Sequence, residues 1–142
     1  MDRDPIRYIL LIVSVVSYVA SLASEAVTGY GGYSILLFGW AEVGALSEVG
    51  PAVALAWYAN PLLLVAWFLG TVDNTRAREA GRVLACIAAF LGLTYIIFGN
   101  KVVTNESGIA STLVTSTTGY QLWIASILFA IARAFLPSGK RE

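Results

Sequence analysis

The sequence predicts an all-α membrane protein: an antiparallel four-helix transmembrane bundle with cytoplasmic N and C termini, an outer interfacial helix and a short β-hairpin. Apolar residues make up 58% of the 142 positions, and the mean hydropathy is +0.75. Charged residues make up only 13%, against about 25% in ordinary soluble domains. This composition excludes a disordered chain, and a single Cys excludes a disulfide scaffold. Nine basic residues balanced by nine acidic ones indicate no nucleic-acid partner.

The chain is expected to form one integral membrane domain over residues 1–142, with four apolar spans. A spanning helix needs roughly 20 mainly apolar residues. The spans are expected at residues 6–26, 52–70, 83–98 and 120–136, and the third helix has an alternative start before its span, in the cytosol. An outer segment (27–51), an inner loop (71–82) and an outer loop (99–119) connect them.

Basic residues test this count, because they mark the cytoplasmic face of a membrane protein. With four crossings, only Lys101 falls on the outer side. The other basic residues all fall on the inner side: Arg3, Arg7, Arg76, Arg78, Arg82, Arg133, Lys140 and Arg141. The pattern therefore predicts a multi-pass protein of the bacterial inner membrane with both termini in the cytoplasm.

Two alternatives compete with this topology. A fifth crossing at 33–50 would place Glu42 near the centre of the bilayer, which is costly, and would move Arg78 outside. This segment fits better as a helix in the outer interface, with Trp40 at headgroup depth. The first span also resembles a signal peptide that ends near Ala23, but its apolar run is long for one, which favours an uncleaved anchor.

Four serines form a small-residue stripe along the first span. Ser14, Ser17, Ser21 and Ser24 follow one another at spacings of three, four and three residues, which places them on one helix face. Helices pack closely in lipid through such stripes, so the stripe is interpreted as a packing seam. The alternative is a hydrated path along the hydroxyl groups.

The second span carries Asn60-Pro61 near its middle. Pro61 has no amide hydrogen and displaces the carbonyl of Trp57, so the sequence predicts a helix kink. Bare carbonyls are costly in lipid, and the Asn60 side chain could satisfy this one or reach a neighbouring helix. The kink either fixes the shape of the bundle or forms a midplane site for a ligand or an ion.

The two outer connections are expected to form a cap over the bundle. Val-rich and Thr-rich stretches at 101–104 and 109–117 flank a turn and favour a short hairpin. A hairpin alone is only marginally stable, so it should lean on the first connection. The outer surface is expected to present Glu25, Tyr30, Tyr33, Trp40, Glu42 and Glu106.

Three short motifs run through the chain: Gly39-Trp40, the stretch 56–63 (AWYANPLL) and the stretch 119–123 (GYQLW). With them the sequence resembles an uncharacterised family of small bacterial four-helix inner-membrane proteins. The resemblance covers most of the chain. It implies the fold and the location and brings no activity with it.

An enzyme is not expected, because the spans lack His, a metal-ligand cluster and a close acid pair. No cofactor or metal is expected, and Cys86 is interpreted as a small packing residue. The leading hypothesis is a membrane-embedded binding or accessory protein. Its outer cap and helix faces would recognise a membrane-protein partner, another copy of the chain or lipid, as a subunit of a larger complex or a toxin-immunity protein does. The alternative is a small oligomeric channel or carrier with a midplane site at Asn60-Pro61.

Overall fold

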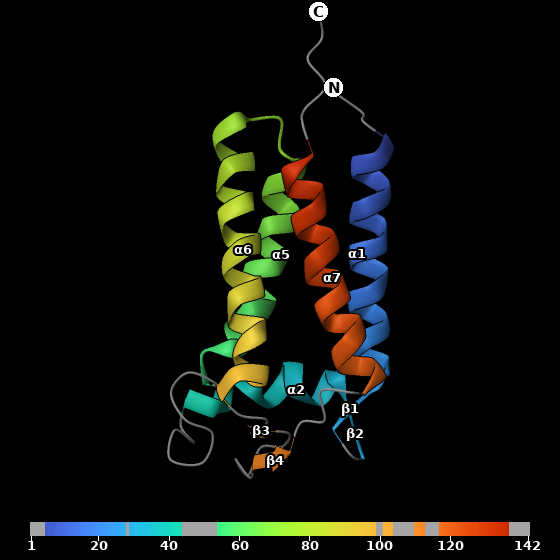
Figure 1. The fold of residues 1–142 in the computed structure, drawn as a ribbon, viewed down its shortest axis with the longest axis vertical. Helices are drawn as coiled ribbons and strands as arrows, with labels where there is room; N and C mark the ends of the chain where they lie inside the picture. Colours follow the sequence, from blue (N-terminus) through green and yellow to red (C-terminus); the bar gives the residue numbers. More distant parts are fainter. Residues whose placement is uncertain are drawn as a thin grey trace, which may run out of the picture.

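Four long helices lie side by side in an antiparallel bundle, and a short helix crosses one end of it (Figure 1). The computed structural model describes residues 5–27, 29–43, 54–98, 101–103, 110–112 and 117–136. The long helices are α1 (Pro5–Ala23), α5 (Ala59–Thr71), α6 (Thr75–Phe98) and α7 (Thr118–Phe135). The all-α prediction is confirmed. Helix α1 packs mainly on α7, and α5 packs mainly on α6.

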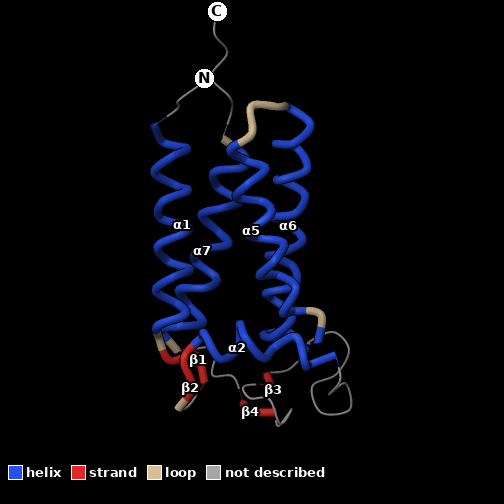
Figure 2. Tube along the Cα trace, turned by 180° about the vertical axis from the view of Figure 1, so that it is seen from behind, coloured by secondary structure: helices blue, strands red, loops and turns tan. Residues whose placement is uncertain are grey.

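The two ends of the bundle differ: one carries most of the described arginines and the other is crossed by short helices. The basic end is where α1 begins, where α7 ends and where residues 72–74 join α5 to α6 (Figure 2). The capped end is the opposite one. There α2 (Gly32–Phe38) and the 3-10 helix η1 (Gly39–Val43) cross beneath the long helices, close to two short hairpins. The segment 33–50 is thus described, as far as Val43, as a helix across the end of the bundle.

Helix α1 ends at Ala23, three residues before the expected end of the first span. The chain then folds back as an antiparallel pair of β1 (Glu25–Val27) with β2 (Tyr30–Gly31). Gly29 makes this turn with φ 81°, a conformation that side chains disfavour. Gly32 follows so closely against α1 that a Cβ there would collide with the Ser21 carbonyl oxygen. Glycines thus allow the chain to double back directly below α1.

The second span is described from Ala54 onwards. A 3-10 turn, η2 (Ala56–Tyr58), leads directly into α5, so Pro61 is the third residue of that α-helix. In the first turn of a helix the missing amide hydrogen of proline is no defect, because no carbonyl within the helix would receive it. The kink at Asn60-Pro61 stays a prediction, and the described change from 3-10 helix to α-helix lies just before it.

The connection between α5 and α6 is short, and α6 extends before the expected span at 83–98, as the alternative start of the third helix allows. Helix α6 begins at Thr75, because the Asn74 side chain caps it. Its Oδ1 accepts hydrogen bonds from the amides of Arg76 at 2.8 Å and Ala77 at 3.3 Å. The expected hairpin is confirmed: β3 (Lys101–Val103) pairs antiparallel with β4 (Ala110–Thr112), with Val102 opposite Ser111.

Small side chains fill the contacts between the long helices. Ser14, Ala56, Ala59, Ala88 and Ser126 are fully buried. Such residues let the helix backbones approach closely, as in membrane bundles. Larger groups complete two buried clusters, one around Leu63 and Ile127 in the middle of the bundle and one near the capped end.

Candidate functional site

The Asn60 side chain joins three long helices inside the bundle. It is 6% exposed. Its Oδ1 accepts hydrogen bonds from Tyr18 Oη on α1 at 3.2 Å and from Trp123 Nε1 on α7 at 2.9 Å. These bonds use both acceptor positions of the amide oxygen. Since buried polar groups are costly without partners, the three side chains depend on one another.

The other end of the same amide completes the start of α5. Asn60 Nδ2 donates to the Trp57 carbonyl at 3.0 Å. This is the carbonyl that Pro61, four residues later, cannot reach with an amide hydrogen. Both roles considered for Asn60, satisfying the Trp57 carbonyl and reaching a neighbouring helix, are present at once. Both occur in the first turn of α5, directly after the 3-10 turn η2.

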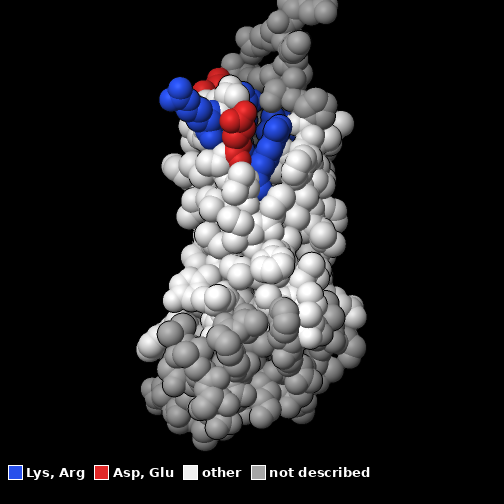
Figure 3. Space-filling view, turned by 60° about the vertical axis from the view of Figure 1, so that its left-hand side comes forward, with Lys and Arg blue, Asp and Glu red and all other residues white. Residues whose placement is uncertain are grey.

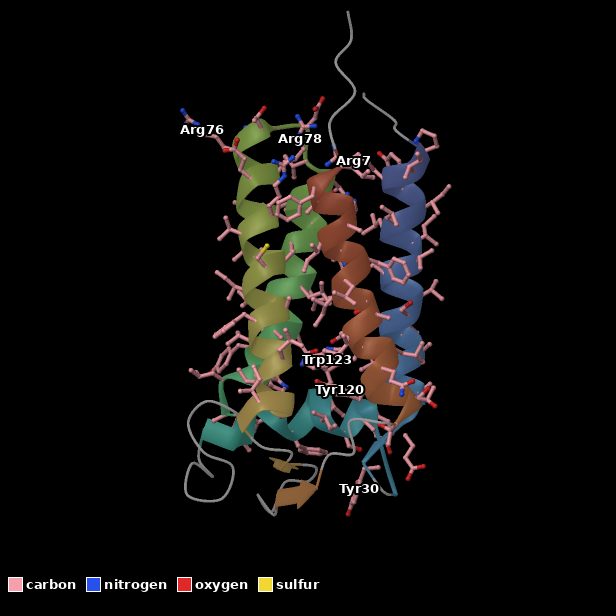
Figure 4. The ribbon with its side chains drawn as sticks, in the orientation of Figure 1. Arg7, Tyr30, Arg76, Arg78, Tyr120 and Trp123 are labelled. Carbon is pink, nitrogen blue, oxygen red and sulfur yellow. The ribbon has the colours of Figure 1, made fainter. Side chains whose placement is uncertain are left out.

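Aromatic rings surround the Trp123 side of this network. The Trp123 ring contacts Tyr95 with ring centroids 6.1 Å apart and Tyr120 with centroids 5.9 Å apart. Tyr120 Oη in turn donates to the Gly92 carbonyl on α6 at 3.3 Å. Figure 4 shows Tyr120 and Trp123 in the lower half of the bundle, above α2. These ring contacts hold the Trp123 indole in the orientation in which its N–H donates to Asn60 Oδ1.

A cavity of about 40 Å³ opens beside these groups, between the long helices and α2. A single water needs roughly 10–15 Å³ measured in this way, so the space admits only a few waters or a small apolar group. Most of its wall is apolar. The lining residues that bear on what the cavity could hold are Ser21, Asn60, Tyr95, Gly119, Tyr120 and Trp123.

Trp57 fixes the cap to the bundle. Its Nε1 donates to the Leu36 carbonyl on α2 at 3.0 Å. The indole also lies against Gly39, where a Cβ would collide with the ring. Trp57 therefore holds the helical segment that follows β2 by a hydrogen bond and by packing.

The serine stripe lies mainly within the bundle. Ser14 Oγ donates to the Ser126 carbonyl at 2.6 Å and accepts from Trp67 Nε1 at 2.9 Å. Ser21 and Ser24 donate to carbonyls of α1 itself, at 2.6 Å and 2.8 Å. Ser14 and Ser21 are buried, whereas Ser17 and Ser24 are half-buried. This arrangement serves packing between α1 and α7.

The expected outer surface is described in part. The Glu25 carboxylate accepts a hydrogen bond from the Gly29 amide at 2.8 Å and so closes the β1–β2 turn. Tyr30, Tyr33 and Trp40 are exposed. The Glu42 side chain and Glu106 lie outside the described residues. Within the described part of the chain, no three His, Cys, Asp or Glu residues are grouped to hold a metal.

Sequence reasoning assigned Asn60 and Trp57 to this region but did not place Tyr95, Tyr120 or Trp123 there. A signal was available, since aromatic residues with polar tips usually sit at the ends of a span. Trp123 lies six residues into its helix and needs a partner for its indole N–H.

Comparisons of the chain with protein-family models, with curated proteins and with solved structures gave no match. The family resemblance of the three motifs therefore stays a prediction.

Proposed function

We propose that this chain is a four-span membrane protein that acts as a binding or accessory protein, with its basic end in the cytoplasm and its capped end as the recognition surface. By length and composition, α1 and α7 are each able to cross a membrane. The observation that carries the proposal is the apolar exterior of all four long helices.

Each long helix turns large apolar side chains outward. Examples with about half or more of their surface exposed are Ile9, Ile12, Val16 and Val19 on α1, Leu64 and Phe68 on α5, Val83, Phe90 and Ile97 on α6, and Leu128 and Phe135 on α7. The largest apolar patch on a soluble monomer is typically about 300–600 Å². An apolar exterior on every helix of a bundle suits the hydrocarbon core of a membrane, because exposing apolar side chains to hydrocarbon carries no free-energy cost.

Apart from Glu25 in the β1–β2 turn, the charged side chains that the structure describes lie at the basic end. Figure 3 shows Arg side chains together with Asp and Glu side chains at the basic end, with a broad uncharged surface below them on the face in view. The described arginines, Arg7, Arg76, Arg78, Arg82 and Arg133, belong to the first turns of α1 and α6 and the last turn of α7. The positive-inside rule favours the cytoplasm for this end.

Packing of α1 supports an anchor that stays attached. Trp67 on α5 donates to Ser14, and Ser14 donates to α7. Tyr18 reaches Asn60 from the same helix. A cleaved signal segment would leave these interior groups without partners.

The capped end supports recognition because it presents an ordered, apolar and aromatic surface. Tyr33, Leu37 and Trp40 are each exposed by more than half, and Trp40 by 60%. Trp57 fixes this segment to the bundle, so little order has to be gained when a partner binds. Amphipathic aromatic side chains suit both the headgroup layer and a protein partner in the membrane plane. The oligomeric channel finds no comparable support, since Ser14 and Ser21 use their hydroxyls inside the bundle.

Cysteine labelling tests the topology. The background is a Cys86→Ala variant, because Cys86 is the one cysteine of the chain. Single cysteines replace Tyr30 at the capped end and Arg76 at the basic end. A membrane-impermeant maleimide should label Tyr30→Cys in intact cells and Arg76→Cys only after the membrane is opened. Labelling of both positions in intact cells would overturn the four-span topology.

Photo-crosslinking tests recognition. A photoreactive amino acid is placed at Trp40 on the cap and, as the matched control, at Phe90 on the exterior of α6. We expect a discrete protein adduct or a defined lipid adduct from position 40, and bulk lipid adducts alone from position 90. Identical adducts from both positions would contradict a recognition surface at the cap.

A further inference from the structure

Three arginines from three helices line one cavity at the basic end. The cavity has a volume of about 60 Å³ and lies between the first turns of α1, the end of α5, the first turns of α6 and the end of α7. Its polar lining comes from Arg7, Tyr8, Thr71, Asp73, Arg78 and Arg133. Figure 4 shows Arg7 and Arg78 at this end beside the last turn of α7, whereas Arg76 points away from the bundle.

Arg133 is the deepest of these groups. It is only 6% exposed, although arginine is rarely buried without a charged partner. Nη1 donates to the Trp67 carbonyl at 3.3 Å. Its Nε is fully buried and has no hydrogen-bond partner among the described residues. A buried donor in this state indicates a missing acceptor, such as an ion or a water.

The surrounding backbone is shaped for this guanidinium. A Cβ at Gly70 would lie 2.6 Å from Arg133 Nη1, so a side chain there would displace the guanidinium from its present position. A smaller cavity of about 10 Å³ shares Arg7, Gly70, Arg78 and Arg133 and extends towards Trp67. The space for the guanidinium is therefore part of the fold.

Arginines dominate the charged groups that the structure describes in the cavity wall. Arg7, Arg78 and Arg133 share this wall with one described carboxylate, that of exposed Asp73, and Arg7 and Arg78 make further interactions of their own. Arg82 is not part of the wall: its Nε donates to the Ala134 carbonyl at 2.5 Å, and its guanidinium lies 5.8 Å from the Phe135 ring centroid. An anion placed among the three arginines of the wall would lower the repulsion between their like charges.

We propose that this cavity binds a phosphate group, either the headgroup of an anionic phospholipid or phosphate free in solution. Guanidinium groups present several N–H donors in a plane and match phosphate oxygens in pairs. Phosphate oxygens in the cavity would accept hydrogen bonds from its three lining arginines and would place an anion beside Arg133, whose Nε has no acceptor among the described residues. Basic pockets between membrane helices on the cytoplasmic side commonly hold such headgroups. The anion site itself does not require the four-span topology; only its lipid source does.

The test uses the full chain, purified in a phosphate-free detergent that carries no net charge, and follows the thermal unfolding midpoint. One arm adds inorganic phosphate against chloride at constant ionic strength. The other arm adds phosphatidylglycerol against phosphatidylcholine, and native mass spectrometry counts the lipids retained. Stabilisation by inorganic phosphate identifies a phosphate site open to solution. Stabilisation by phosphatidylglycerol alone identifies a headgroup site.

The variants separate this site from general surface charge. Arg133→Gln and Arg78→Gln should each weaken binding by roughly tenfold or more, as expected for the loss of a charged hydrogen bond. Arg76→Gln removes the same charge from the same end but lies outside the cavity, so its binding should be unchanged. Gly70→Ala fills the space beside Nη1 and should also weaken binding. If Arg133→Gln fails to fold, the binding of Arg78→Gln and Gly70→Ala is compared with that of Arg76→Gln to test the proposal.

Two results would overturn the proposal: no stabilisation of the unaltered chain in either arm, or an equal loss from Arg76→Gln and from the cavity variants. Both are independent of the cysteine-labelling result, so a wrong topology and a wrong anion site can be told apart.

Discussion

Asn60 does the work of several residues, because one amide group closes the start of α5 and receives donors from α1 and α7. A side chain with this many partners is hard to replace. Aspartate keeps the two acceptor positions but loses the donor to the Trp57 carbonyl, and leucine keeps only the volume. The role is structural in the described part of the chain, and it also fixes the wall of the neighbouring cavity.

Asn60→Leu should lower the free energy of unfolding by about 1–3 kcal/mol, because Tyr18 Oη and Trp123 Nε1 lose their shared acceptor while buried. Tyr18→Phe should cost less, about 0.6 kcal/mol, as is common for hydrogen bonds between membrane helices. Unfolding in mixed micelles, followed by circular dichroism, measures both.

The double variant distinguishes this network from independent packing effects. With Asn60 already replaced, Tyr18→Phe should cost little or even restore stability, because it removes a donor that has lost its partner. Fully additive losses would contradict a shared role for Asn60.

Segments of the fold show where sequence patterns suffice and where they fail. The hydropathy of the sequence and the helical spacing of its apolar residues locate the long helices, because each long helix needs one continuous apolar face. The β1–β2 turn escaped prediction, since it depends on the close approach of Gly32 to the end of α1. The start of α6 at Thr75 agrees with the alternative that the third helix begins before its span, and Asn74 is a capping residue that marks this start in the sequence. The burial of Arg133 depends on Gly70 in another helix, which no local pattern reveals.

The seam between α1 and α7 leads to a matched prediction. Ser14→Leu should destabilise the bundle by about 1–3 kcal/mol, because it forces a larger side chain into a fully buried site against Ser126. Ser17→Leu lies on the same helix but at a half-buried position and should cost less than half as much. Unfolding midpoints in one detergent compare them. Equal losses would mean that the two positions face the same environment.

The attachment of the cap gives a local prediction. Trp57→Leu removes the hydrogen bond to the Leu36 carbonyl and the ring beside Gly39. Amide exchange over residues 32–41 should accelerate by roughly tenfold, while α6 and α7 stay protected, because local opening needs only a fraction of the total stability. The exposed neighbour Tyr58→Leu serves as control. Acceleration throughout the bundle would show instead that Trp57 supports the whole fold.

The molecule as a whole combines an apolar exterior, charges at one end and an aromatic cap at the other. Phe90, 65% exposed on α6, offers the clearest test of the surrounding medium. Phe90→Arg should lower the yield of membrane-inserted protein and cost about 3 kcal/mol, because a charge near the middle of the bilayer is disfavoured. In water the same change would be nearly neutral.

Glu79→Gln is the control for this variant, since it changes the net charge by the same amount at the exposed basic end. Membrane fractionation and unfolding in nanodiscs compare the two. If Phe90→Arg matched Glu79→Gln in both measurements, α6 would not face hydrocarbon.

The bundle is closed by the contact between its first and last helices, with the Ser14 hydroxyl bonded to a carbonyl 112 residues later in the chain. During synthesis α1 must therefore wait for α7, which is made after α5 and α6. Until then the seam of α1 lacks the helix that covers it, and its serines can turn back onto their own helix, as Ser21 and Ser24 do even in the finished fold. A ribosome stalled before residue 118 would leave a precursor whose bundle is open along the side where α7 belongs.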